Sequence, residues 1–391
     1  MPWIHLYVDT NGNAKACCNT RITYGNVNKQ SIESIWNGEP VKKFRKNLLE
    51  GIKDNRCASC FKREAVNKSS IRTETLEKFK PFLEWVKKTS PDGTCNDSKP
   101  IYLDIRYSNV CNLKCRTCWH GASSSWFNDA KILKTNFGDK PIIKATTNNE
   151  KLIDELSSFD TEFEEVYFAG GEPLMMEEHY SFLESLLSKK QTSVHLRYNT
   201  NLSKLKLKDK NVLDYWKQFK HVTISVSIDS IREKAEYIRS GLIWQNLLDN
   251  IAHIKDQCPH INIQIAPTVS NLSIHTLSEL HRFFVENNLI GINDIYLNIL
   301  DRPNYYNCKN IPQLLKEKIK NKIESHIKWL HEKKANQNVI SEFESVIDYM
   351  IKNANTNNIK AFTKQITKLD KIRNESFTKT FPDLSLYYSG N

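Results

Sequence analysis

Three cysteines stand close together in the stretch SNVCNLKCRTCWHGASSS. Three residues separate Cys111 from Cys115, and two separate Cys115 from Cys118. Thiolates at this spacing can wrap one metal cluster from a single loop. Four cysteines would fill every coordination position of such a cluster, whereas three leave one iron open for a ligand that reacts. The spacing therefore predicts a metal cluster with one open coordination position, at which a bound ligand reacts.

A zinc site is the alternative at this point, because His120 lies close enough in the sequence to supply a fourth ligand. Zinc sites usually pair two short hooks across a longer gap. Three cysteines in one run therefore favour iron.

The pattern Cys111-x3-Cys115-x2-Cys118 resembles the cluster loop of the radical S-adenosylmethionine (SAM) superfamily. This resemblance implies a [4Fe-4S] cluster whose open iron chelates the amino and carboxylate groups of SAM. Reductive cleavage of SAM would then give a 5'-deoxyadenosyl radical that abstracts hydrogen from a substrate. The family often has an aromatic residue before the third cysteine, near the adenine. Here Thr117 stands at that position and Trp119 follows the cysteine, so Trp119 is the candidate adenine contact.

The turn Ala169-Gly-Gly-Glu-Pro173 follows an expected strand. Its glycines let the backbone approach a ligand closely, and Glu172 offers a carboxylate to an ammonium group. In a chain with this cysteine loop, the turn matches the family motif that holds the amino group of SAM. The motif assigns Gly170, Gly171, Glu172 and Pro173 to cofactor binding.

Ser227 and Asp229 end another expected strand, and side chains two residues apart on a strand point to the same face. That arrangement suits two ribose hydroxyls, while capping of the next helix by Asp229 or Ser230 is the alternative. The family places ribose contacts here. It also implies that Arg239 neutralises the carboxylate of SAM, and Asn199 and Thr268 complete the candidate cofactor residues.

A second set of cysteines lies near the N-terminus, with Cys17 after Gly12 and a Cys57-x2-Cys60 hook. This set resembles the twitch domain, a half-size SPASM domain that carries an auxiliary iron-sulfur cluster. The family's first ligand lies upstream of a Pro-Trp pair, which here is Pro2-Trp3. The fourth ligand is therefore open between Cys18, Cys308 and a residue upstream of Met1, and the cluster could be open or absent. A structural zinc on Cys17, Cys18, Cys57 and Cys60 is the alternative.

Composition narrows the class of protein. The chain has 391 residues, 39% of them hydrophobic, no apolar run of membrane-span length and no basic-then-apolar signal segment, so we expect a cytoplasmic protein. Its ten cysteines cluster in short hooks, which favours metal ligation over disulfides, except for Cys95, which we expect to be a surface thiol. Of the net charge of +11, residues 301–391 carry +6, and there the basic residues are interleaved with acidic ones. This pattern is typical of solvated helices rather than of nucleic-acid binding.

The expected elements alternate between strands and helices, which predicts a parallel α/β sheet. The resemblance implies a partial (β/α)6 TIM-like barrel with its chemistry at the carboxyl ends of the strands. We expect an α+β twitch-like domain over residues 1–90, the radical SAM core over 91–300 and a helical region over 301–391. Expected strands cover 101–106, 165–168, 194–198, 222–228, 261–266 and 294–300; expected helices cover 31–50, 74–88, 151–158, 177–188, 212–219, 243–257, 274–287, 311–334, 339–351 and 361–374.

The predicted function is that of a radical SAM enzyme. Its partners would be SAM, a reductant such as flavodoxin or ferredoxin, and an unidentified substrate, either a peptide or protein to be modified or a sugar-like alcohol to be oxidised. The alternative from another class is a non-enzymatic protein stapled by zinc that binds nucleic acid through its basic surface.

Overall fold

A computed structural model describes residues 1–65, 69–135, 138–159, 161–353 and 355–388. The chain forms two compact units, and each is described by itself. The first unit contains Met1–Val110, Ile142–Tyr198 and Lys206–Val222, and the second contains Cys111–Pro141, Asn199–Leu205 and Thr223–Asn391. No helix in the part of the chain that the structure describes is both long and apolar enough to cross a membrane.

The first unit is built on a sheet with the strand order β7-β6-β4-β1-β2-β3. Parallel pairing joins β1 (His5–Val8), β4 (Tyr102–Ile105), β6 (Glu165–Phe168) and β7 (His195–Thr200). The strands β2 (Asn13–Lys15) and β3 (Thr23–Asn26) continue the sheet in antiparallel pairing. Because β1 pairs directly with β4, the N-terminal segment extends the same sheet as the predicted core.

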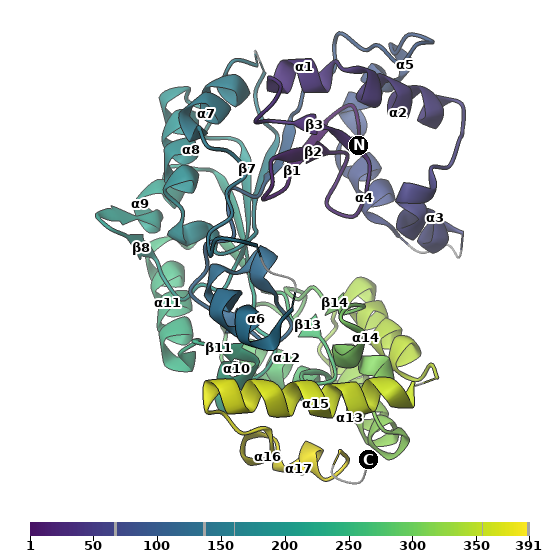
Figure 1. The fold of residues 1–391 in the computed structure, drawn as a ribbon, viewed down its shortest axis with the longest axis vertical. Coiled ribbons are helices and arrows are strands. Elements are labelled where there is room, and N and C mark those ends of the chain that lie inside the picture. The colour runs from purple at the N-terminus through teal and green to yellow at the C-terminus, as the bar shows by residue number, and fades with distance from the viewer. Residues whose placement is uncertain (66–68, 136–137, 160, 354, 389–391) are drawn as a thin grey trace. The chain divides into compact units, whose positions relative to one another are not determined.

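The two faces of this sheet differ in chemistry. Leu6, Leu103, Val166 and Leu196 lie opposite one another in register and are fully buried. Helices α7 (Asn149–Ser157) and α8 (Glu177–Ser188) lie beside the strands (Figure 1), and α8 contributes an aromatic contact to β6. The opposite face carries the cross-strand row Tyr7, Asp104, Tyr167 and Arg197. A parallel sheet is usually apolar on both faces, so this polar face is suited to a ligand.

Short helices follow the N-terminal strands: α1 (Ile32–Trp36), α2 (Glu39–Leu49), α3 (Ala58–Glu64), α4 (Ile71–Lys78) and α5 (Glu84–Lys87). The continuous helix expected over residues 31–50 was wrong in detail, because the chain breaks at Gly38. Pro40 lacks an N–H and is therefore accommodated in the first turn of α2.

The expectation of a surface thiol at Cys95 was wrong. Its side chain is buried beside Trp3, Ile4 and Ile101. The thiol donates to the carbonyl oxygen of Trp85 across 3.1 Å. The segment around Cys95 is polar, but the thiol itself packs as a small apolar group, as free cysteines commonly do.

The remainder of the first unit contains β8 (Lys206–Leu207), β9 (Lys210–Asn211) and α9 (Val212–Trp216). In the second unit β10 (His221–Val226) pairs in parallel with β12 (Asn262–Ile265), and β13 (Thr268–Val269) pairs in parallel with β14 (Asn298–Ile299). An antiparallel pair joins β5 (Lys114–Cys115) to β11 (Arg239–Ser240).

Helices make up most of the second unit, and one of them is α15, drawn in yellow in Figure 1. In chain order they are α6 (Phe127–Leu133), α10 (Arg232–Ile238), α11 (Trp244–Gln257), α12 (Leu277–Glu286), α13 (Gln313–Glu332), α14 (Gln337–Met350), α15 (Thr356–Arg373), α16 (Phe377–Thr380) and α17 (Pro382–Ser385).

The predicted α/β class with parallel strands and a helical C-terminal region is confirmed. The (β/α)6 barrel and the domain boundaries at residues 90 and 300 stay predictions. The strand expected over 294–300 is shorter than predicted, since within it only β14 and a bridge from Ile295 to Ile265 are paired. The helices α6 and α10, which flank the cysteine loop and the Arg239 segment in the sequence, were not predicted.

Candidate metal and cofactor sites

The backbone of the cysteine loop is held by the residues that follow it. The serine hydroxyls Oγ of Ser123 and Ser125 donate to the carbonyl oxygens of Leu113 and Cys111, each across 2.7 Å. The indole N–H of Trp126 donates to the carbonyl oxygen of Cys115 across 2.8 Å. Residues 123–126 therefore restrain the backbone of the cysteine loop by hydrogen bonds to its carbonyl oxygens. The sequence analysis assigned these residues no role.

The three thiols of the loop, on Cys111, Cys115 and Cys118, form one electrostatic group. Burial, together with the neighbouring Cys115 and Cys111, raises the pKa of Cys118 to about 12. Burial also raises the pKa of Cys115, while the guanidinium of Arg239 lowers it. A raised pKa means that these thiols do not lose their protons easily while they lie beside one another. A metal cation that replaces the protons would neutralise the thiolates and so stabilise the group.

Two polar side chains approach these sulfurs. Nη1 of Arg239 lies 3.7 Å from Sγ of Cys115, and Nδ2 of Asn201 lies 3.9 Å from Sγ of Cys111. Donors of this kind stabilise thiolates, so the donor set fits an iron-sulfur cluster. Among the described residues, no three His, Cys, Asp or Glu side chains are gathered in the arrangement that holds a metal ion. Asn201 reaches the loop, whereas the sequence placed Asn199 among the candidate cofactor residues.

Arg239 is fixed by a buried ion pair with Asp229. Its Nη2 donates to Oδ1 of Asp229 across 3.0 Å, and its Nε lies 2.9 Å from Oδ2. The backbone N–H of Thr268 donates to the same Oδ1 across 2.7 Å. Burial alone would lower the pKa of Arg239, but the charges of Asp229 and Cys115 raise it. A positive charge is therefore held beside the Cys115 sulfur.

The alternative of helix capping by Asp229 or Ser230 is wrong, because Ile231 occupies the N-cap of α10. Of the other predicted contacts in the second unit, Ser227 is half-buried and its backbone N–H donates to Thr200 across 2.8 Å. Asn199 is half-buried. Trp119 is 55% exposed, and its ring lies where a side chain on Gly121 would clash. The SAM contacts assigned to these residues stay predictions.

In the first unit the glycines of the Gly-Gly-Glu-Pro turn are required by geometry. Gly170 and Gly171 have φ of +82° and +55°. A Cβ on Gly171 would stand 2.3 Å from the carbonyl oxygen of Val110, and one on Gly170 would stand 2.8 Å from Cδ of Arg106. The N–H of Glu172 donates to that Val110 oxygen across 2.7 Å. The turn is thus pinned to the residue that precedes Cys111 in the chain.

The carboxylate of Glu172 is buried, with 1% of the residue exposed. Its Oε1 accepts from the N–H of Leu174 across 3.1 Å at the start of the short 3-10 helix Pro173–Met175. Pro173 is buried in the same turn. One oxygen of Glu172 therefore caps a helical turn, and the contact to the amino group of SAM remains a prediction.

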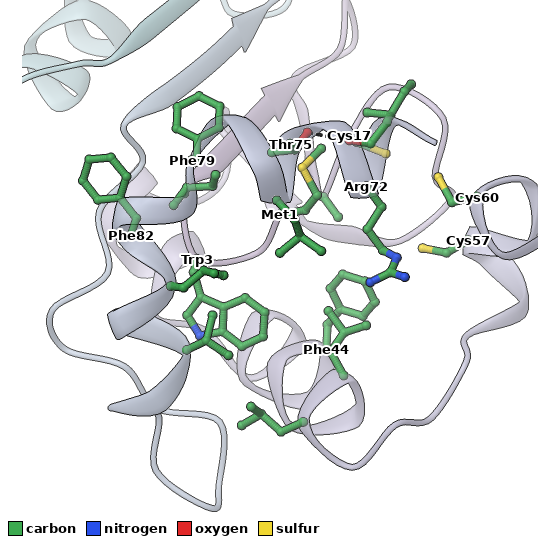
Figure 2. A pocket seen from close by; sticks show the side chains of 18 of the residues that line it. Met1, Trp3, Cys17, Phe44, Cys57, Cys60, Arg72, Thr75, Phe79 and Phe82 are labelled. Carbon is green, nitrogen blue, oxygen red and sulfur yellow. Dashed lines mark hydrogen bonds between the residues drawn. The ribbon is translucent and has the colours of Figure 1, made fainter. Parts of the chain in front are cut away.

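The N-terminal cysteines converge on a cavity of about 230 Å³ in the first unit. Figure 2 shows Cys17, Cys57 and Cys60 along one side of it, with Arg72 beside them. Burial, together with the neighbouring Cys18, Cys57 and Cys60, raises the pKa of Cys17 to about 12. The hydroxyl of Thr20 lies 3.5 Å from Sγ of Cys57. These thiols also fit a metal cluster by their chemistry.

The far side of the cavity is apolar, with Trp3, Phe79 and Phe82 labelled there in Figure 2. Arg72 forms an ion pair with Glu64, which keeps the guanidinium at the cysteine end.

The candidates for a fourth ligand differ from these three cysteines. Cys18 is exposed, its Sγ lies 3.8 Å from Oδ1 of Asn19, and it is not among the described lining of the cavity. Cys308 is buried in the second unit, where burial raises its pKa to about 12. The fourth ligand of the N-terminal site therefore stays open.

Comparisons with known families agree with this division of the cysteines. Residues 105–284 match the model of the radical SAM superfamily, and residues 1–61 match the model of the SPASM iron-sulfur cluster-binding domain. The chain thus contains a region that matches the radical SAM superfamily and, in front of it, a region that matches the SPASM domain, in the order that the resemblance predicted. The first match implies a [4Fe-4S] cluster and SAM, and the second supports an auxiliary cluster.

Solved structures are similar only at a low level. A structure titled "Native anSMEcpe with bound AdoMet and Cp18Cys peptide" is 16% identical with a TM-score of 0.40, over 58% of each chain. A structure titled "Structure of TYW1 with a lysine-pyruvate adduct bound" is 12% identical with a TM-score of 0.27, over 44% of this chain and 57% of that one. This chain therefore spans less than two thirds of either. No curated protein matches the chain.

Proposed function

We propose that this protein is a radical SAM enzyme whose catalytic cluster is held by Cys111, Cys115 and Cys118. The observation that carries the proposal is the loop itself, in which Cys111 and Cys115 act electrostatically on Cys118 and Arg239 lies 3.7 Å from the sulfur of Cys115. When bound, the cluster supplies an electron that cleaves SAM to methionine and a 5'-deoxyadenosyl radical, which abstracts a hydrogen atom from the substrate.

The protein's own residues position these groups. Arg239 and Asn201 stabilise negative charge on the sulfurs of Cys115 and Cys111. The glycines at 170 and 171 keep the backbone free of side chains where the predicted motif would meet SAM. In this proposal the buried carboxylate of Glu172, which the turn holds in place, binds the ammonium group of SAM.

The remaining cofactor contacts follow the predicted assignment. Arg239 and Asp229 would meet the carboxylate and ribose of SAM after their mutual ion pair opens or shifts. Trp119 is exposed, as a side chain that packs on an adenine must be before SAM binds. Pro173, Asn199, Ser227 and Thr268 complete the proposed set.

We propose that Cys17, Cys57 and Cys60 would hold the auxiliary cluster, which when bound would accept an electron from the substrate radical or ligate the substrate. The polar face that includes Tyr7 and Tyr167 is the proposed side for a hydrogen-bonding substrate, a peptide or protein or a sugar-like alcohol. A flavodoxin or ferredoxin would supply the electron for SAM cleavage.

The test is anaerobic reconstitution with iron and sulfide, followed by dithionite and SAM. We expect 5'-deoxyadenosine and methionine to form with the wild-type chain and with Cys95→Ala, whose thiol lies in the core. Cys115→Ala should abolish both products. Zinc in place of iron, or deoxyadenosine formation that survives Cys115→Ala, would contradict the proposal.

A further inference from the structure

The residue after the central cysteine of the loop is a fully buried arginine. The side chain of Arg116 has no exposed surface. Its backbone directly follows β5, which sets Cys115 opposite Arg239, and its N–H donates to the carbonyl oxygen of Ile238 across 2.7 Å. The thiol of Cys115 and the guanidinium of Arg116 are thus fixed by the same short segment.

The guanidinium of Arg116 ends among groups from the C-terminal segment. Its Nη2 donates to Oδ1 of Asp370 across 2.6 Å and also to Oε2 of Glu375. Its Cζ lies 3.6 Å from the centre of the Tyr237 ring, and the hydroxyl of Tyr237 donates to the same Asp370 oxygen across 2.7 Å. Two carboxylates and an aromatic face around one buried guanidinium form a charge-assisted network.

The end of α15 is shaped for this contact. Asn374 has φ of +54°, the left-handed conformation that commonly ends a helix. The turn brings Glu375 back, with its N–H donating to the carbonyl oxygen of Asp370 across 3.0 Å. Oδ2 of Asp370 accepts from the N–H of Phe377 across 2.6 Å. The turn therefore places Glu375 beside Asp370, and a backbone N–H holds the carboxylate of Asp370.

A second tie runs from the same helix end to the other side of the loop. Nε of Arg373 donates to Oδ2 of Asp129 across 2.8 Å, and its Cζ lies 4.8 Å from the centre of the Trp126 ring. The indole of Trp126 in turn donates to the carbonyl oxygen of Cys115. Glu375 also accepts from the hydroxyl of Ser240 across 2.7 Å. The loop is thus held from both sides by residues 370–375.

We infer that residues 370–375 clamp the cysteine loop, and that Asp370 and Glu375 are positioning residues which fix Cys115 through Arg116. They lie more than two hundred residues from the loop in the chain and touch none of its sulfurs in the described contacts. The consequence for a cluster rests on the proposed function, whereas the clamp itself belongs to the fold and can be measured without iron.

The first experiment measures amide hydrogen exchange in the metal-free full-length protein. In an Asp370→Asn, Glu375→Gln variant, peptides covering residues 111–126 should exchange at least about tenfold faster, because charged hydrogen bonds that restrain local opening are lost. Peptides from α13 and α14 should keep their protection. The matched control, Glu344→Gln, Asp348→Asn, removes two exposed carboxylates from α14 and should leave the loop unchanged.

The second experiment reconstitutes the same variants with iron and sulfide and follows iron release to a chelator. The double variant should release its loop-bound iron several-fold faster than the control. The single variant Glu375→Asp keeps the negative charge, so its rate of iron release should be close to that of the control. If the double variant unfolds, Glu375→Gln alone is used for both measurements.

Unchanged exchange in residues 111–126 together with intact α13 and α14 would overturn the clamp. Faster exchange with no iron bound by any variant would support the clamp and contradict the proposed cluster. Equal exchange and iron release in the double variant and its control would contradict both the clamp and its role in cluster retention.

Discussion

The chain has two cysteine triads, and their surroundings differ. Around Cys111, Cys115 and Cys118, the backbone is held by hydroxyl and indole donors, and a buried arginine faces a sulfur. Around Cys17, Cys57 and Cys60, the structure instead forms a cavity of about 230 Å³ whose far side is apolar. The backbone around the first triad, proposed to hold the catalytic cluster, is thus restrained by hydrogen bonds. The second triad, proposed to hold the auxiliary cluster, has open space beside its cysteines.

Arg239→Met should show the largest effect in the first region. It leaves Asp229 buried without its charged partner, which should lower the free energy of unfolding by about 3–5 kcal/mol. Urea denaturation of the metal-free protein measures this change. Lys322→Met, which breaks the exposed pair with Glu279, should cost less than about 1 kcal/mol. If both variants lower the free energy of unfolding equally, the buried pair of Arg239 and Asp229 stabilises the fold no more than an exposed ion pair does, and the proposal is contradicted.

Acid should weaken the second region through His5. This side chain is buried, hydrogen-bonds the carbonyl oxygen of Ala16 across 3.0 Å and stacks on Tyr102. Burial lowers its pKa from 6.5 to about 3, so the unfolded chain takes up a proton that the folded chain excludes. Stability contributed by His5 is therefore complete above pH 6.5 and falls as the pH drops toward 3.

Measured by urea denaturation, this loss should be about 1.4 kcal/mol per pH unit between pH 6 and pH 4. His5→Gln keeps an N–H for Ala16 but cannot titrate, and should remove that part of the slope. The exposed His253→Gln serves as the control and should keep the wild-type slope. If the free energy of unfolding of His5→Gln changes with pH as steeply as that of the wild type, protonation of His5 does not weaken the region of the N-terminal triad.

Trp126→Phe should have a smaller effect on the first region. The variant loses the indole hydrogen bond to the Cys115 carbonyl, which contributes about 1 kcal/mol to the free energy of unfolding. Trp244→Phe makes the same ring change in a buried aromatic cluster where the described contacts are ring contacts. If Trp126→Phe costs no more than Trp244→Phe, the indole does not restrain the loop.

The sequence predicted the elements whose side chains repeat with a clear period. The apolar alternation of β4, β6 and β7 and the amphipathic pattern of α8 placed those elements within one or two residues of their observed bounds. The pair β5 and β11 escaped prediction because two-residue strands carry no period. Yet this pair places Arg239 at Cys115.

The cysteines of both triads were predictable from spacing, but their supports were not. The carboxylates that hold Arg116 come from Asp370 and Glu375, and nothing near them in the sequence relates them to the loop. The exposed state expected for Cys95 failed for a similar reason, since its polar neighbours gave no sign of the core formed with Trp3 and Ile101. Both the partners of Arg116 and the burial of Cys95 depend on contacts between segments that are far apart in the sequence.

The most direct test of two triads with different roles is to count iron and assay 5'-deoxyadenosine in three reconstituted proteins. The wild-type chain should hold about eight irons as two [4Fe-4S] clusters and form deoxyadenosine from SAM. Cys57→Ala, Cys60→Ala should hold about four and still form it, whereas Cys115→Ala, Cys118→Ala should hold about four and form none. Equal loss of deoxyadenosine in both double variants, or iron content unchanged by either, would contradict the account.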